Sequence, residues 1–213
     1  MAKQEDIPDL ERGTDLSRIA AFTDGVFAIA ITLIVLQLDV PDRITTDPEL
    51  WQQVFRNEGV DFVAFLISFA VIGRYWVLNH QLMRMVGAFD HRMLGLLLLY
   101  LLFIVLIPFS SELLGEHGDL KLSLVVYIVN LVLVNFSTTL LMVHIRKADL
   151  EKPGFPDVLD SWIKASWFVT AVFALTIPLA LFIGSWALFL WIPAIKLNPW
   201  ERRMNAQQKA ARE

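Results

Sequence analysis

The chain has 213 residues, of which 56% are hydrophobic, with no cysteine and a formal net charge of −4. The absence of cysteine excludes disulfides and thiolate metal sites. Its mean hydropathy is +0.55, and long apolar segments recur along it, which favours a membrane protein with several crossings over a soluble domain. These segments lack the alternation of barrel strands, so the sequence predicts an all-α membrane protein.

The first crossing is predicted over residues 18–38, before Pro41 ends it. About twenty residues at 1.5 Å each span a hydrocarbon layer of roughly 30 Å. Residues 1–17 are polar and contain no cleavable signal, so we expect a cytoplasmic N-terminal segment there. Asp24 lies inside the span, where a carboxylate costs about 2.5–3.5 kcal/mol. A passive anchor would not need this residue.

Further helices follow along the chain, each bounded by a cap, a proline or a polar loop. Asp90 is a plausible N-cap and Pro108 should kink or end its helix, leaving a loop over 110–119. The apolar run 162–197 is too long for one crossing, so Pro178 and Gly184-Ser185 should divide it into a fifth helix and a short sixth. The expected segments are crossings at 60–82, 90–108 and 120–144, a loop at 146–157, and a short surface helix at 50–55. The sequence therefore predicts a six-helix transmembrane domain over 18–197, followed by a cytoplasmic tail over 198–213.

The distribution of positive charge predicts the orientation. With both termini, the 82–92 loop and the 146–164 region in the cytoplasm, fifteen of the 18 lysines and arginines lie there when Arg18 and Arg74 are counted at cytoplasmic helix ends. The exceptions are Arg43, Arg56 and Lys121. The amides and hydroxyls of the 120–144 helix suit contacts between helices in lipid.

One stripe of the first helix has a distinctive composition on a helical wheel. It consists of Arg18, Phe22, Gly25, Ile29, Thr32, Leu33 and Leu36. Two interpretations fit it. The aliphatic residues can form the wall of a narrow pore with a dry constriction, or the stripe can be a seam for packing against other helices.

Asp24 points away from this stripe and needs a partner, because a lone ion in hydrocarbon is costly. The polar end of the second helix supplies Arg74, Asn79 and His80. A network of these groups could transfer protons or could clamp the two helices together.

Sequence motifs for an enzyme are absent. The four histidines are scattered, with no paired spacing for a metal, no nucleophile elbow and no phosphate or dinucleotide loop. We therefore expect no enzymatic activity, no cofactor and no nucleic-acid partner. The Thr-Val-Gly-Tyr-Gly filter of ordinary potassium channels is absent too, so any ion selectivity must be built differently.

The segment Arg18-Ile-Ala-Ala-Phe22-Thr23-Asp24 and the VFAIAITLIVLQLDVP that follows Gly25 resemble the Arg-x-x-x-Phe-Ser-Asp signature and first helix of the transmembrane protein 175 family of potassium channels, in its bacterial single-repeat form. Thr23 replaces the usual serine and keeps the hydroxyl. The second helix, with Trp76, Asn79 and His80, and the segment LIPFSSELLG are also similar to this family.

The resemblance implies a homotetramer in the lipid bilayer whose four first helices line a central cation pore. Ile29 then matches the narrowest apolar layer, Leu33 and Leu36 match further apolar layers, and Thr32 matches a polar ring associated with potassium preference. Residues expected to hold helices together by a structural hydrogen-bond network are Arg18, Phe22, Thr23, Asp24, Trp76, Asn79 and His80.

Together these observations predict a passive, potassium-permeable channel of a bacterial inner membrane, with its termini in the cytoplasm. Potassium would pass along Ile29, Thr32 and Leu36 without a fixed metal site, with a modest preference over sodium. The alternative is a proton-coupled or other secondary transporter that uses Asp24 and His80. A third interpretation is a scaffold protein without transport.

Overall fold

The computed structural model describes residues 14–38, 46–47, 59–118, 120–184, 187 and 191. Its long elements are all helices, which confirms the predicted all-α class. They are α1 (Thr14–Leu33) with its 3-10 continuation η1 (Ile34–Gln37), α3 (Gly59–Met85), α4 (His91–Glu116), α5 (Lys121–Lys147) and α6 (Pro156–Ile183). Four of the described helices, those at 16–37, 91–116, 121–147 and 156–183, are long and apolar enough to cross a membrane.

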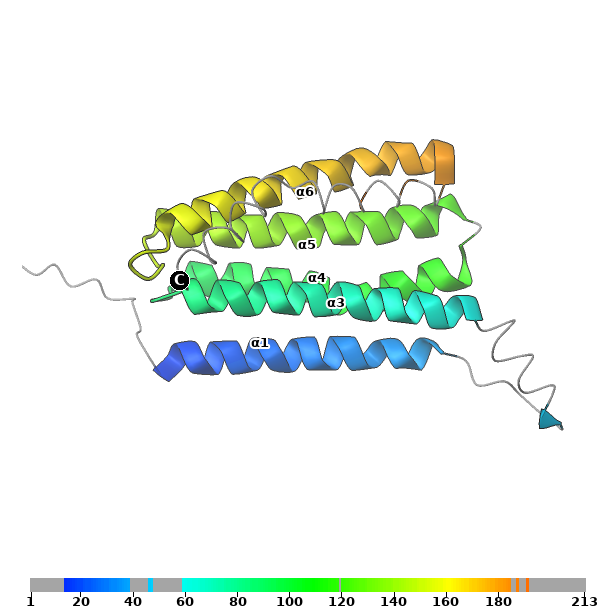
Figure 1. The fold of residues 1–213 in the computed structure, drawn as a ribbon, viewed down its shortest axis with the longest axis horizontal. Helices are drawn as coiled ribbons and strands as arrows, with labels where there is room; N and C mark the ends of the chain where they lie inside the picture. Colours follow the sequence, from blue (N-terminus) through cyan, green and yellow to red (C-terminus); the bar gives the residue numbers. More distant parts are fainter. Residues whose placement is uncertain are drawn as a thin grey trace, which may run out of the picture.

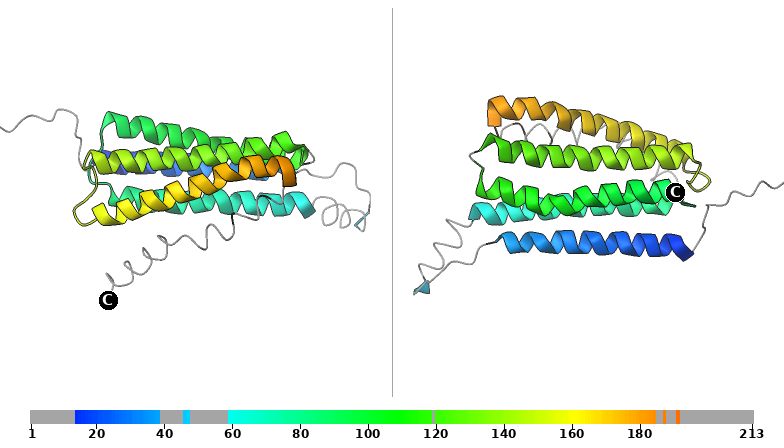
Figure 2. Two further views of the ribbon diagram at one scale, coloured as in Figure 1. Left: turned by 90° about the horizontal axis from the view of Figure 1, so that it is seen from above. Right: turned by 180° about the vertical axis from the view of Figure 1, so that it is seen from behind.

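The helices run side by side and alternate in direction, with α1 at one edge and α6 at the opposite edge (Figure 1). Among the described residues, α1 contacts α3 and α4, α4 packs closely on α5, and α5 packs closely on α6. Figure 2 shows the same order from behind. The start of α1, the turn after α3 and the turn after α5 lie at one end of the bundle (Figure 1). This grouping agrees with the sequence analysis, which placed all three on one side of the membrane.

Polar side chains link the buried helices, as the amide-rich sequence of α5 predicted. Asn130 Nδ2 donates to Ser110 Oγ on α4 at 3.1 Å, and the hydroxyls of Thr139 and Ser166 lie 2.6 Å apart between α5 and α6. In lipid, hydrogen bonds and close packing hold helices together because apolar burial between them gains little.

Pro108 was predicted to kink or end its helix. It does not end α4, and the expected loop over 110–119 is instead helical as far as Glu116. Side-chain donors beside the proline take up backbone carbonyls. Gln37 Nε2 donates to the Pro108 carbonyl at 2.6 Å and Ser110 Oγ to the Ile107 carbonyl at 3.1 Å. Pro108 removes one helical bond, that to the carbonyl of Ile104, and the packing of α4 on α1, α3 and α5 supports a continuous helix around this gap.

Pro178 likewise fails to divide α6, which is continuous from Pro156 to Ile183. The adjacent Thr176 hydroxyl donates to the Phe173 carbonyl at 2.6 Å. The predicted end at Gly184 is confirmed, since Gly184 has φ 62°, a conformation that favours glycine. Most of the predicted sixth helix and the surface helix at 50–55 lie outside the described residues.

The turn between α3 and α4 is tied to the loop between α5 and α6. Val86 forms an isolated antiparallel bridge with Glu151, and the amides of Gly87 and Lys152 donate to Leu150 and Met85 at 2.8 Å. A Cβ on Gly87 would lie 3.1 Å from Lys152 Cγ, so glycine suits this close approach. This contact fixes the ends of four helices relative to one another.

Candidate functional site

The stripe predicted on the first helix forms the exposed outer face of α1. Ile29 is 61% exposed, Leu33 40% and Leu36 75%, although all three are aliphatic. The remaining members, Arg18, Phe22, Gly25 and Thr32, are exposed as well. On the opposite face Phe27, Ala30 and Ile34 are buried against α3 and α4. Among the described residues, the stripe is therefore not a packing seam between helices of this chain.

Thr32 supplies the polar group on this face. Its hydroxyl donates to the carbonyls of Ala28 and Ile29, at 2.9 Å each, in the preceding turn of α1. Because the hydroxyl proton is directed to the backbone, the oxygen lone pairs are left to accept from water or to face a cation. An exposed apolar face thus contains one oxygen ligand between Ile29 and Leu36.

Asp24 is joined to α3 by Trp76. The indole Nε1 of Trp76, a member of the expected hydrogen-bond network, donates to Asp24 Oδ1 at 2.9 Å. The indole reaches Asp24 because it carries its single N–H donor at the far edge of a large ring. His80 takes part indirectly, because its ring centroid lies 5.8 Å from that of Trp76.

The other expected network members are arranged differently. Thr23 is fully buried, but its hydroxyl donates to the Ile19 carbonyl of its own helix at 2.8 Å. Asn79 is buried on α3, and its Oδ1 has no hydrogen-bond partner among the described residues. Phe22, at 55% exposed, belongs to the outer face. The bond between Asp24 and Trp76 is thus a direct hydrogen bond between α1 and α3.

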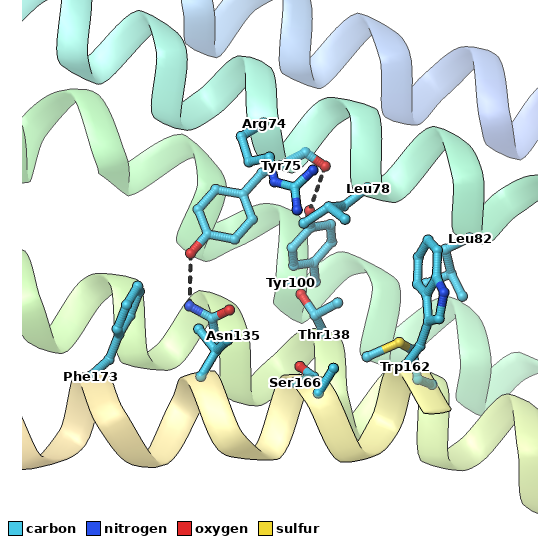
Figure 3. Close-up of a pocket in the computed structure, with 13 residues that line it drawn as sticks. Arg74, Tyr75, Leu78, Leu82, Tyr100, Asn135, Thr138, Trp162, Ser166 and Phe173 are labelled. Carbon is cyan, nitrogen blue, oxygen red and sulfur yellow. Dashed lines mark hydrogen bonds between the residues drawn. The ribbon is translucent and has the colours of Figure 1, made fainter. Parts of the chain in front are cut away.

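A second polar connection joins α3 to the rest of the bundle. Asn135 Nδ2 of α5 donates to the Tyr75 hydroxyl at 2.7 Å, inside a cavity of about 150 Å³ that also contains Arg74 (Figure 3). Tyr75 and Trp76 are neighbours in sequence, so their side chains leave α3 in different directions. One reaches α5 and the other reaches α1.

At the end of the bundle where α4 begins, Asp90 performs two roles. It caps α4 by accepting from the Met93 N–H at 2.6 Å, which confirms the predicted N-cap. It also pairs with His144 Nε2 of α5 at 2.9 Å. Although burial opposes ionisation, the Met93 and His144 hydrogen bonds hold the pKa of Asp90 below its usual value.

Comparison with known proteins gives consistent matches. Residues 18–108 match the family model described as the endosomal/lysosomal potassium channel TMEM175. A crystal structure of a lysosomal potassium-selective channel TMEM175 homolog from Chamaesiphon minutus superposes with a TM-score of 0.75 and 26% identity, over 91% of this chain and all of that one. This chain is similar to TMEM175 channels in the sequence of residues 18–108 and in its fold.

Proteins similar to this chain occur in bacteria and in animals. Potassium channel B446_29190 of Streptomyces collinus is 37% identical over 100 residues, or 47% of this chain and 48% of that protein. The endosomal/lysosomal proton channel TMEM175 of Rattus norvegicus is 35% identical over 82 residues, or 35% of this chain and 16% of that protein. The chain spans about half the length of the bacterial relatives that it matches first.

The sequence did not predict that Tyr75 joins α3 to α5 through Asn135. Tyrosine and asparagine were visible as polar residues in two apolar helices, and such residues commonly pair. The choice of partner depends on how α3 and α5 lie beside each other, which periodicity within either helix does not contain.

Proposed function

We propose that this chain forms a homotetrameric, potassium-permeable cation channel in which the outer faces of four α1 helices surround the pore. The observation that carries the proposal is the exposed stripe of Ile29, Leu33 and Leu36 on a helix whose other face is buried. Arranging four copies so that this stripe faces a common axis leaves a narrow apolar constriction between them. The names of the matched family and of its bacterial members support potassium as the ion.

The apolar ring accounts for a modest preference for potassium. A potassium ion holds its hydration water less tightly than sodium does, so it loses less when it sheds part of that water in a constriction at Ile29. The Thr32 oxygens, one from each copy, would replace some of the lost water. Selectivity from dehydration alone is weak, because no backbone carbonyls replace the full hydration shell.

The proposed arrangement in the membrane follows the charge distribution. The N-terminal segment 1–17, the turn at 86–90 and the loop at 148–155 would lie in the cytoplasm of a bacterial inner membrane, together with the tail 198–213. A sixth crossing before residue 197 would return the chain to that side. Asp24 then serves to hold α1 on α3 and does not ligate the ion.

The experiment is conduction by purified protein in planar bilayers, with reversal potentials in mixed potassium and sodium. We expect passive currents with potassium favoured by less than about tenfold, and Ile29→Asn should raise conductance or reduce discrimination by wetting the constriction. Ile67→Asn is the matched control, because Ile67 is 56% exposed on α3, away from α1's outer face. Equal effects of both changes would remove Ile29 from the pore.

Two further outcomes would overturn the proposal. Flux that stops without a proton gradient would instead indicate a carrier using Asp24 and His80, and proton currents exceeding potassium currents would change the ion. Particle images lacking a fourfold ring with α1 at its axis would contradict the assembly.

A further inference from the structure

A cavity of about 150 Å³ lies behind α3, on the side away from the proposed pore (Figure 3). Four helices form its walls. They contribute Tyr75 and Leu78 from α3, Tyr100 from α4, Asn135 from α5, and Trp162 and Phe173 from α6. Cα atoms of α3 do not approach those of α5 or α6 closely among the described residues, so side chains and the cavity fill the space between them.

The side-chain amide and hydroxyl groups of Asn135, Thr138 and Ser166 in the wall have partners in the protein. The Asn135 amide donates to the Tyr75 hydroxyl at 2.7 Å and to the Leu131 carbonyl at 2.9 Å. Thr138 donates to the Val134 carbonyl at 2.8 Å, and the Ser166 hydroxyl is paired as described above. These groups therefore require neither water nor a polar ligand, and the cavity favours an apolar occupant.

The indole nitrogen of Trp162 is buried and has no hydrogen-bond partner among the described residues, so the accessible part of that ring in the wall is carbon. Arg74 also lines the cavity, and its positive charge disfavours a cationic occupant.

The shape and chemistry of the wall specify the ligand further. Aromatic rings stand on several sides of the cavity, on Tyr75, Tyr100, Trp162 and Phe173 (Figure 3). Aromatic side chains pack favourably against another ring in offset or edge-on arrangements. An apolar cavity of about 150 Å³ is large enough for benzene. One ring is therefore the size that fits.

We propose that this cavity is a binding site for a small neutral aromatic molecule, about one ring in size. The site does not depend on whether the chain conducts potassium, because it is formed by α3 to α6 and not by the outer face of α1. Its location behind Tyr75 places an occupant next to the residue that joins α3 to α5.

The test uses the full chain in detergent, labelled with 5-fluorotryptophan, with bromobenzene as the probe. The fluorine signal of Trp162, assigned through Trp162→Phe, should shift with saturation because this ring lines the cavity. Trp167 is 43% exposed on α6 and reports partition of the probe into detergent, so its signal should not saturate. Benzoate, which has the same ring with a negative charge, should bind at least tenfold more weakly.

A cavity-filling variant supplies the matched comparison. Ala165 is buried in the wall, so Ala165→Leu should weaken bromobenzene binding at least tenfold, whereas Ala174→Leu, on an exposed position of the same helix, should not. A Trp162 shift that does not saturate, equal binding by the two leucine variants, or tighter binding of benzoate would overturn the proposal.

Crystals of the unmodified chain soaked in bromobenzene give a measurement that does not depend on variants folding. An anomalous bromine peak among Tyr100, Trp162 and Phe173 is expected. Ordered water filling the cavity, with no bromine there, would overturn the proposal.

Discussion

The two helices α1 and α5 are both long and apolar enough to cross a membrane but differ in how much of their surface the rest of the chain covers. Half of the apolar window of α5 is buried inside the protein, against 22% for α1. α5 is packed between α4 and α6, whereas the outer face of α1 has no partner among the described elements. The apolar surface of α5 is covered mainly by helices of its own chain. The outer face of α1 must be covered by lipid, water or further copies of the chain.

Their polar residues show the same difference. On α5, Asn130 and Asn135 donate to side chains of neighbouring helices. On α1, the Thr23 and Thr32 hydroxyls donate to their own backbone, and Asp24 forms the bond to α3. Because hydrogen bonds and packing hold membrane helices together, α5 is the fixed part of the bundle and α1 is the part held by few contacts.

The largest expected difference between the two helices is in the free energy of unfolding that an isoleucine-to-alanine change removes. Ile128→Ala on α5 removes a side chain with 0% exposure and should lower the free energy of unfolding by about 2 kcal/mol, the low end for buried aliphatics because lipid or detergent is also apolar. Ile29→Ala should change it by less than about 0.5 kcal/mol. Unfolding in mixed micelles at increasing denaturing detergent measures both.

This pair also separates a pore wall from an interface between copies. If Ile29 packed tightly against a neighbouring copy, its loss would destabilise the assembly by an amount comparable with that of Ile128→Ala. Such a result would remove Ile29 from the pore even if the tetramer formed.

Asp90 should contribute the next largest effect, at the end of the bundle where α4 meets α5. Asp90→Ala removes the cap on Met93 and the contact with His144, and should cost about 1.5 kcal/mol at pH 7. Thermal unfolding followed by circular dichroism measures the loss. Asp157→Asn, an exposed residue in the first turn of α6, is the control and should change little.

The pH dependence at Asp90 has a definite sign. Its folded-state pKa is below the usual value, so its charge stabilises the fold above the unfolded pKa of about 3.9, and this contribution is lost as the pH falls through the folded pKa. Asp90→Asn keeps an effective cap without the charge. The stability of the variant should therefore fall less steeply below about pH 4 than that of the parent, and parallel curves would contradict the role of the charge.

Parts of this arrangement were readable from the sequence because they depend on local periodicity. The outer stripe follows from the 100° spacing in one helix, and the cap follows from Asp90 standing before an apolar run. The partner of Asp24 was not readable, since the choice between Trp76 and its neighbours depends on the rotation of α3 against α1. That Pro108 and Pro178 do not end their helices was not readable either, because the packing of α4 and α6 on α5 that supports continuous helices is visible only in the fold.

Trp76→Phe tests how weakly α1 is held. The change keeps a ring on α3 but removes the donor to Asp24. The free energy that holds α1 on α3 should fall by about 1 kcal/mol. This is less than for a buried hydrogen bond to a charged group, because the site is partly exposed. Amide hydrogen exchange should quicken in α1 and not in α5. A double-mutant cycle with Asp24→Asn should recover most of this energy as coupling, whereas additive effects would mean that the bond contributes nothing. Trp167→Phe on α6 is the control.

Tyr75→Phe should have the smallest effect and addresses the residue that lies between the two regions. Asn135 loses the Tyr75 hydroxyl but keeps its bond to the Leu131 carbonyl, so no buried donor group is left wholly unpaired and the cost should be about 0.5 kcal/mol. Tyr100→Phe is the matched control, because its 3.5 Å bond is at the limit of hydrogen bonding. Exchange should quicken in α3 while α5 stays protected, since α5 retains its contacts with α4 and α6. Faster exchange throughout α5 would show instead that α5 depends on the Tyr75 contact for its stability. Its packing against α4 and α6 would then not be enough to hold it in place.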